Sequence, residues 1–102
     1  FAPEKAFLLA NAEYALEIID IGGFSESRQR QIKGRIIGTG GKIRRLIEQS
    51  TGCFVSVYGK TVSIIGKWTD IANAKQSIYM LIEGSKISNV QRFLLAVRRE
   101  RL

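Results

Sequence analysis

The segment of residues 34–44 constrains the fold of this chain more than any other, because four glycines fall within eleven residues. Three of them crowd into the tetrapeptide Gly38-Thr39-Gly40-Gly41. Glycine adopts positive φ without steric cost, so such a cluster interrupts a helix and marks a tight turn. Apolar residues at helical spacing predict a helix over residues 42–50 after the turn. A helix over residues 28–37, with Ser25 or Ser27 as its cap, is expected before the turn. Two helices joined by a G-x-x-G turn are therefore expected.

Two other phosphate-binding glycine patterns fit this segment poorly. A P-loop ends in a glycine, a lysine and a hydroxyl residue; Gly41-Lys42 fits, but Ile43 replaces the hydroxyl and Ile36 replaces the first glycine. A dinucleotide fingerprint would need its last glycine at Ile43 and a strand, not a helix, before the loop. The G-x-x-G turn remains, either as a plain turn that needs small residues or as a surface that a nucleic-acid backbone can approach closely.

The charge of the chain is concentrated around this turn. Residues 28–45 hold seven Lys or Arg and no Asp or Glu, which equals the net charge of +7 for the whole chain. Residues 1–27 hold five acidic residues and one lysine, and residues 86–102 hold five basic residues and one acidic residue. A concentrated basic patch is typical of a site for a polyanion, although a solvated helix face is the alternative. The helix after the turn also presents free N–H groups and a positive dipole end to a phosphate.

The residue types that the chain lacks argue against several classes of protein. The chain has no histidine, and Cys53 is its only cysteine. Metalloenzymes, triad hydrolases and disulfide-rich secreted domains are therefore disfavoured, and no metal, cofactor or catalytic residue is expected. No signal peptide or membrane-spanning run is visible, so a cytoplasmic protein is expected. The chain starts at Phe1 rather than Met, which suggests a piece of something longer.

The remaining sequence predicts a single mixed domain. A short helix from Pro3 to about Asn11 precedes a strand over residues 14–21. Strands over residues 53–58 and 61–65 flank Gly59-Lys60, which favours a hairpin with a type II′ turn. Two amphipathic helices follow, one ending near residue 84 and one over the last residues.

Side chains that cap helices indicate where the predicted helices begin. Ser25 or Ser27 is expected to cap the helix before the glycine turn, and Thr69 or Asp70 the helix after the hairpin. The tetrapeptide 88–91 has the form of a capping box for the last helix.

The segment Ile36–Ile43, set in the order strand–helix–helix–strand–strand–helix, resembles a type I KH domain. Residues 33–38, 41–42, 51–52 and 55–66 are more specifically similar to the second KH domain of the Partner-of-Nob-One (Dim-two) family, as are the flanking segments near both ends. The resemblance implies an α+β fold in which a three-stranded antiparallel sheet packs on three helices. It divides the chain into an N-terminal helical extension (1–13), a KH domain (14–84) and a C-terminal amphipathic helix (85–102).

The family resemblance also implies a function. A KH domain binds four single-stranded nucleotides at its G-x-x-G loop. Members of this family are small-subunit assembly factors that bind near the 3′ end of the precursor rRNA. The implied partners are a Nob-type endonuclease and, in the archaeal branch, the alpha subunit of translation initiation factor two. A monomeric, non-enzymatic, archaeal RNA-binding protein with an earlier degenerate KH domain is therefore expected.

The residues expected to contact RNA lie on the two helices, the loop and the second strand. They are Lys33, Gly34, Arg35, Ile37, Gly38, Thr39, Gly40, Gly41, Lys42, Arg44, Arg45, Glu48 and Val57. Thr39-Gly40 and Arg44 depart from the family pattern, in which the loop usually has a basic residue and the third position after it is apolar. Arg44 therefore favours ionic or stacking contacts over an apolar base pocket.

Three alternatives stay open from the sequence. Glu48 either accepts a hydrogen bond from a base or pairs with Arg44 or Arg45 one turn away, and Val57 belongs either to the groove or to the core. The whole domain could instead be a protein-interaction module with an idle KH groove, using the acidic first segment and the last helix. A nuclease or NTPase is disfavoured because the P-loop is broken and carboxylates are not clustered.

Overall fold

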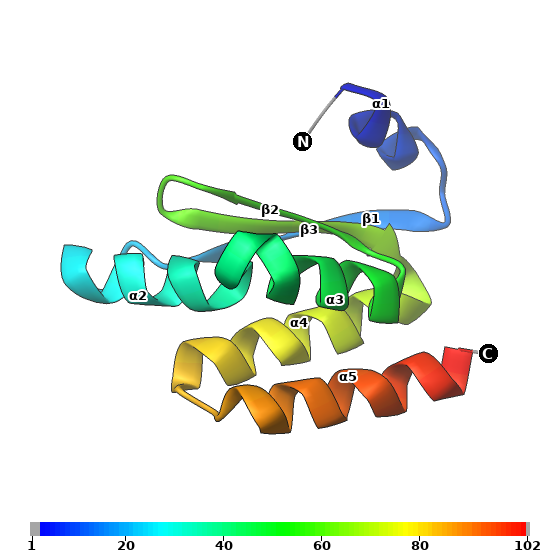
Figure 1. Cartoon of the computed structure of the whole chain (residues 1–102). Helices are drawn as coiled ribbons and strands as arrows, with labels where there is room; N and C mark the ends of the chain where they lie inside the picture. The colour runs from blue at the N-terminus through cyan, green and yellow to red at the C-terminus, as the bar shows by residue number, and fades with distance from the viewer. Residues whose placement is uncertain (1–2, 102) are drawn as a thin grey trace.

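The computed structural model describes residues 3–101 and contains one three-stranded antiparallel sheet with helices on both of its faces (Figure 1). The chain begins with helix α1 (Pro3–Ala6) and the 3-10 helix η1 (Phe7–Ala10), followed by strand β1 (Tyr14–Asp20). The elements that follow are α2 (Glu26–Ile37), η2 (Thr39–Gly41), α3 (Lys42–Thr51), β2 (Phe54–Tyr58), β3 (Thr61–Lys67), α4 (Trp68–Glu83) and α5 (Ile87–Arg101). The expected α+β fold is confirmed.

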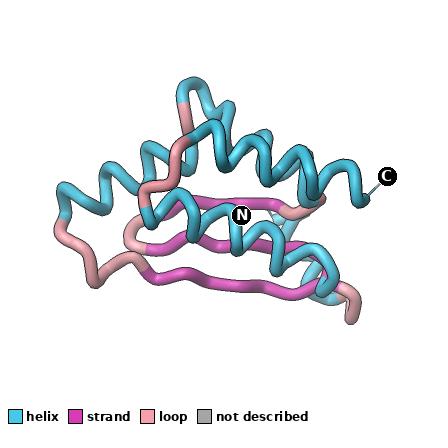
Figure 2. The backbone as a smooth tube through the Cα atoms, turned by 90° about the horizontal axis from the view of Figure 1, so that it is seen from below, coloured by secondary structure: helices cyan, strands magenta, loops and turns pink. Residues whose placement is uncertain are grey.

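The strands lie in the order β1-β3-β2, so β3 is central and β1 and β2 are the two edges. Tyr58 pairs with Thr61 across the two-residue turn, which confirms the predicted hairpin. Gly59 has φ +55, and no non-glycine residue among residues 3–101, Lys60 included, has a positive φ; this is the pattern that a type II′ turn requires. Figure 2 shows the strands side by side with the helices running along them.

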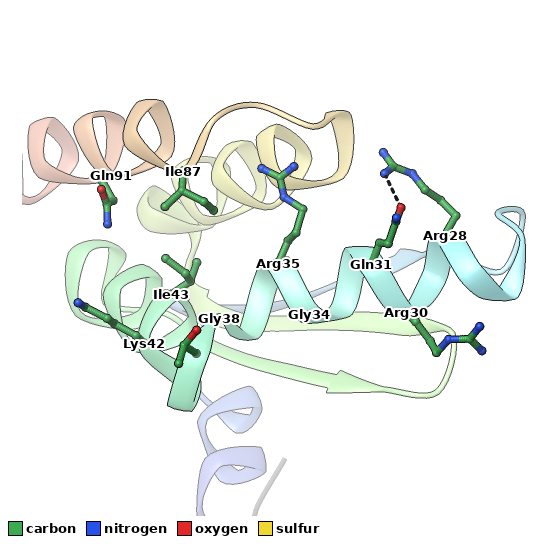
Figure 3. Close-up of a pocket in the computed structure, with 11 residues that line it drawn as sticks. Arg28, Arg30, Gln31, Gly34, Arg35, Gly38, Lys42, Ile43, Ile87 and Gln91 are labelled. Atoms are coloured by element: carbon green, nitrogen blue, oxygen red, sulfur yellow. Dashed lines mark hydrogen bonds between the residues drawn. The ribbon is translucent and has the colours of Figure 1, made fainter.

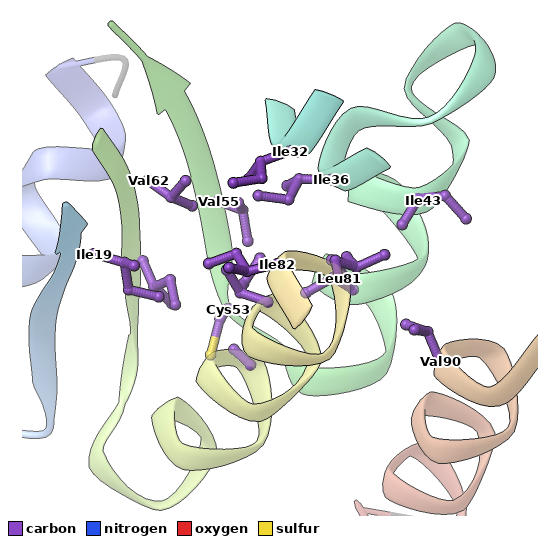
Figure 4. Packing of buried hydrophobic residues seen from close by; sticks show 14 of the residues in the cluster. Ile19, Ile32, Ile36, Ile43, Cys53, Val55, Val62, Leu81, Ile82 and Val90 are labelled. Atoms are coloured by element: carbon purple, nitrogen blue, oxygen red, sulfur yellow. The ribbon is translucent and has the colours of Figure 1, made fainter. Parts of the chain in front are cut away.

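Helices α2, α3 and α4 bury one face of the sheet. Because side chains alternate along a strand, Ile19, Val55 and Val62 point to this face and form the core with the isoleucines of the helices (Figure 4). Ile64, which pairs with Val55, belongs to the same cluster. A side chain at Gly66 of β3 would face the helices as well. Because glycine has no Cβ, the thiol of Cys53 occupies that space. The core is therefore one continuous apolar cluster between the sheet and the helices.

Helix α5 packs below α3 and α4 and buries Val90, Leu94 and Val97 (Figure 1). A three-residue connection joins it to α4, so the two helices run back along each other. No helix among residues 3–101 is long and apolar enough to cross a membrane.

The opposite face of the sheet is covered only in part. The segment α1–η1 lies over it and contacts β1 and β3, and the Lys5 ammonium sits 4.0 Å from the centroid of the Phe54 ring. Leu16 and Ile18 of β1 lie on this open face with 43% and 56% of their surface exposed. The sheet thus has one buried face and one partly apolar, accessible face.

Several predicted boundaries are wrong, each for a physical reason. Strand β3 continues past residue 65 to Lys67 because Tyr14 of β1 pairs with that lysine. Helix α4 then starts directly at Trp68 with no side-chain cap, so neither Thr69 nor Asp70 caps it. Ser88 lies inside α5, whose first hydrogen bonds run to the carbonyl of Lys86, so the capping box does not form. Ser25, one of the two proposed caps, does accept a hydrogen bond from the backbone N–H of Arg28.

Candidate nucleic-acid interface

The glycine loop between α2 and α3 depends on backbone conformations that only glycine adopts easily. Gly38 has φ +74 and ψ 174, Gly40 has φ +62 and Gly41 has φ +77. The Gly38 conformation lies in a region that is essentially restricted to glycine. A Cβ there would also lie 2.9 Å from the backbone nitrogen of Ile43. The loop is therefore glycine-rich by necessity, and Thr39 is its one residue with a side chain.

The loop surface is open to a ligand. A Cβ at Gly40 would meet no atom within 4 Å, and Thr39 and Gly40 are exposed. Arg45 folds back from α3 so that its guanidinium donates to the carbonyl of Gly40 at 2.7 Å. A cation is thus held against the loop backbone, where a phosphate that approaches the glycines would lie.

Helix α2 presents basic side chains on two different sides. Lys33 donates to the carbonyl of Gly59 in the hairpin turn at 3.0 Å, which links α2 to the β2–β3 hairpin. Arg35 instead donates to the carbonyl of Ser85 in the α4–α5 connection. Residues two positions apart on a helix are separated by about 200° around its axis, so Lys33 and Arg35 necessarily diverge.

Helix α3 also divides its polar residues between two sides. Glu48 accepts a hydrogen bond from the backbone N–H of Val55 on β2 at 2.8 Å, and Arg44 lies one turn earlier on the same side. Lys42 and Arg45 line a hollow between α3 and α5. The expected pairing of Glu48 with Arg44 or Arg45 is absent among the ion pairs of the described residues.

Strand β2 offers backbone groups at the free edge of the sheet. The Val55 N–H points outward to Glu48, and alternation along the strand directs the N–H and C=O of Val57 to the same edge. The Val57 side chain is half-buried and packs against the core. Val57 can therefore serve the core through its side chain and a ligand through its backbone.

The basic residues of segment 28–45 have no acidic partner within residues 3–101. The ion pairs there join Lys75 to Glu17 and Arg101 to Asp70. The hydrogen bond from Glu17 raises the pKa of Lys75, and burial raises the pKa of the Cys53 thiol. Both groups lie away from the loop. The positive charge at the loop is thus uncompensated, as a site for a polyanion requires.

The structure sorts the predicted contact residues into three groups. Gly38–Gly41 form the loop itself. We call the group between the loop and β2 the β2 side: Lys33, Ile37, Arg44, Glu48 and Val57. Gly34, Arg35 and Lys42 border a hollow on the α5 side, and Arg45 lies at the loop next to it.

Sequence reasoning missed the other residues of that hollow, among them Arg28, Gln31, Ile87 and Gln91 (Figure 3). Arg28, Gln31 and Arg35 repeat at helical spacing, which is the one signal the sequence held. The contribution of α5 depends on how that helix packs and has no local signature.

Comparisons with known proteins agree with this geometry. A model of the eukaryotic-type KH domain (KH domain type I), namely the second such domain of the Partner-of-Nob-One family, matches residues 15–99. A KH domain-containing protein of Methanocaldococcus jannaschii is 45% identical over 96 residues, which cover 92% of this chain and 42% of that protein.

Solved structures are similar over almost the whole chain. Dim2p from Pyrococcus horikoshii has 44% identity and a TM-score of 0.86, covering 94% of this chain and 57% of that one. A chain in the a/eIF2alpha–aDim2p–rRNA complex of the same organism has 42% identity and a TM-score of 0.89, covering 98% and 55%. A protein of Aeropyrum pernix has 42% identity and a TM-score of 0.91, covering 99% and 55%. The chain therefore spans about half the length of the relatives it matches.

Proposed function

The chain belongs to the family of the second, type I KH domain of Partner-of-Nob-One (Dim2-like) proteins, and from this premise we propose that it binds single-stranded RNA through its glycine loop. The observation that carries the proposal is the loop itself. The loop backbone is accessible at the exposed residues Thr39 and Gly40, and the basic residues around the loop have no acidic partner among the described residues. Such a surface suits a phosphate backbone held without side-chain obstruction.

We propose that the loop takes up about four nucleotides, as other KH domains do. The phosphates lie against the loop and near Lys33, Lys42 and Arg45, whereas the bases lie toward the β2 side. There the outward N–H and C=O of Val57 offer one donor and one acceptor, and Arg44 offers a planar cation for stacking.

We assign the RNA target to the 3′ region of small-subunit rRNA or its precursor, within a ribosome biogenesis factor. An archaeal Dim2p similar to this chain occurs in a complex with a/eIF2alpha and rRNA. The alpha subunit of initiation factor two and a Nob-type endonuclease are the proposed protein partners. We assign no chemical step to this chain and propose that the endonuclease cleaves the rRNA.

The test combines a charge change in the loop with a matched neutral change. Thr39→Asp with Gly40→Asp places two negative charges at the phosphate position, and Thr39→Asn with Gly40→Asn places side chains of the same shape without charge. Asp and Asn both tolerate positive φ better than other residues, so both variants keep the loop. We expect the Asp pair to lose on the order of 100-fold in affinity and the Asn pair only a few-fold.

The ligand for this test is an oligonucleotide from the 3′ end of small-subunit rRNA, compared with a scrambled one at several salt concentrations by fluorescence anisotropy. Three to five phosphate contacts predict a log–log salt slope of roughly −2 to −3.5. Unchanged affinity in the Asp pair would contradict the assignment of the loop. Equal affinity for the scrambled sequence would contradict the rRNA assignment alone.

A second candidate function is protein binding through the open face of the sheet. The specific observation is that Leu16 and Ile18 remain exposed there, next to an acidic N-terminal segment that includes Glu13. We propose this face for the initiation-factor subunit. It lies on the side of the sheet away from α2 and α3, so both functions can operate together (Figure 1).

A further inference from the structure

A basic hollow lies on the α5 side of the glycine loop (Figure 3). Its volume is about 760 Å³, and it is bordered by α2, the start of α3 and the first turns of α5. The four charged residues that line it are all basic: Arg28, Arg30, Arg35 and Lys42. Ile43 and Ile87 supply its apolar part, and Gln91 faces it from α5.

Two of the arginines are held in place before any ligand arrives. Arg28 donates to the carbonyl of Ile82 at 2.7 Å and to the side chain of Gln31 at 3.3 Å, and Arg35 donates to the carbonyl of Ser85. A guanidinium has five N–H donors, so both retain donors that are free of these bonds. Because these two side chains are already held in place, binding a ligand costs less side-chain entropy.

Carbonyl oxygens orient these guanidinium groups but do not neutralise them. Within residues 3–101 none of the four basic side chains forms an ion pair. Arg28 and Arg35 are seven residues apart, which is about 10 Å along the axis of α2. The hollow thus presents an ordered row of uncompensated cations instead of a single charge. An extended anion with repeated charges matches such a row better than a small ion does.

The hollow is continuous with the loop, because Gly38 and Thr39 of the loop line it and so does Lys42, which follows the loop directly. We propose that RNA which crosses the glycine loop continues past Lys42 into this hollow, where Arg28 and Arg35 bind the phosphates of flanking nucleotides. The binding site is then longer than the four nucleotides of the loop. This inference rests on the proposed function, and it adds α5 to the RNA-binding surface.

Gln91 allows a test in which the shape of the hollow is kept and its charge changes. Gln91→Glu is isosteric and adds a negative charge that faces the phosphates, whereas Gln91→Lys adds a positive one. Gln76→Glu on the exposed side of α4, outside the hollow, is the matched control for net charge. Thermal melting of each variant verifies that folding is unchanged.

The measurement compares a four-nucleotide oligomer with oligomers extended by four nucleotides at the 5′ or the 3′ end. We expect one extension to raise affinity and to steepen the salt slope by about 0.7 for each added phosphate contact. Gln91→Glu should weaken that extended oligomer by about three- to tenfold, and Gln91→Lys should strengthen it. Both variants should change binding of the four-nucleotide oligomer clearly less than they change binding of the extended one, since only the loop end of the hollow is shared with the shorter oligomer.

The outcomes separate this inference from the proposed function. If the short oligomer binds but neither extension adds affinity, or if Gln76→Glu weakens the extended oligomer as much as Gln91→Glu does, the hollow is not an RNA site although the loop assignment stands. If no oligomer binds, the proposed function itself fails. A second variant, Arg28→Lys, should retain most of the extended-oligomer affinity, whereas Arg28→Gln should lose it; equal loss in both would indicate a purely structural arginine.

Discussion

The two edge strands of the sheet have opposite surroundings. Strand β2 carries no charged residue, and its free edge faces α3 and the glycine loop, with the basic residues Lys33 and Arg44 on the same side. Strand β1 shows Leu16 and Ile18 to solvent on its open face, and alternation along the strand places Asp20 on the same face. Glu17 points to the opposite face, where it pairs with Lys75 of α4. Both strands pair with β3 in the same antiparallel manner, so the difference comes from what packs beside them.

This contrast teaches how one small sheet can serve two kinds of ligand. At the β2 edge, the N–H of Val55 is hydrogen-bonded to Glu48, and the basic side chains of Lys33 and Arg44 lie on the same side. These surroundings suit a nucleic acid. The open face of β1 combines apolar side chains with the carboxylate of Asp20, and a protein surface complements that combination better than a phosphate backbone. Each prediction below changes one edge and leaves the other as the internal control.

The largest effect on stability is expected from Gly38→Ala, which changes the loop that positions α3 against β2. The φ and ψ of Gly38 are nearly exclusive to glycine, and the new Cβ would contact the backbone of Ile43. We expect a loss of about 2–4 kcal/mol in the free energy of unfolding, measured by urea denaturation. Gly34→Ala is the control, since its Cβ meets open space, and it should stabilise α2 by about 0.5–1 kcal/mol. Equal stability of the two variants would show that the loop conformation is not strained by a Cβ.

An intermediate effect is expected from Glu48→Ala, which removes the acceptor for the Val55 N–H at the β2 edge. A half-buried amide left unpaired should lower the free energy of unfolding by about 1–2 kcal/mol. Glu48→Gln keeps an acceptor oxygen and should cost less. Hydrogen exchange of the Val55 amide gives a direct readout, which should accelerate in Glu48→Ala. Exchange as slow as in the parent protein would mean that the hydrogen bond contributes nothing.

The smallest effect on stability is expected from Leu16→Lys with Ile18→Lys on β1. Both side chains lie on the open face, so each change should alter the free energy of unfolding by no more than about 0.5 kcal/mol. RNA affinity should stay within about twofold, whereas capture of the initiation-factor alpha subunit in a pull-down should be lost. Gln76→Lys supplies the charge control. Retained capture would remove β1 from the protein interface.

Much of the fold could be predicted from the sequence, because its strongest signals are local. The glycine turn, the apolar spacing after it and the Gly59-Lys60 hairpin each depend on neighbouring residues. The extension of β3 to Lys67 could not be foreseen, since it depends on pairing with Tyr14, more than fifty residues away. The start of α4 moved for the same reason, because the strand runs directly into the helix.

The site could be predicted in composition but not in arrangement. The charge of segment 28–45 identified a basic surface, yet charge summed along a sequence does not tell the sides of a helix apart. The sequence therefore assigns Lys33 and Arg35 to one site, whereas one contacts the hairpin and the other the α4–α5 connection. Glu48 was considered for base contact or ion pairing, and its bond to Val55 is a tertiary contact that neither pattern indicated.

The hydrogen bonds of Lys33 to Gly59 and of Glu48 to Val55 have a kinetic consequence. They join both helices beside the loop to the hairpin and to β2, so the surface is already assembled before RNA arrives. Association with such a preformed surface requires no slow rearrangement, and charge attraction sets its rate. Differences in affinity between RNA sequences should then reside in how slowly each one leaves.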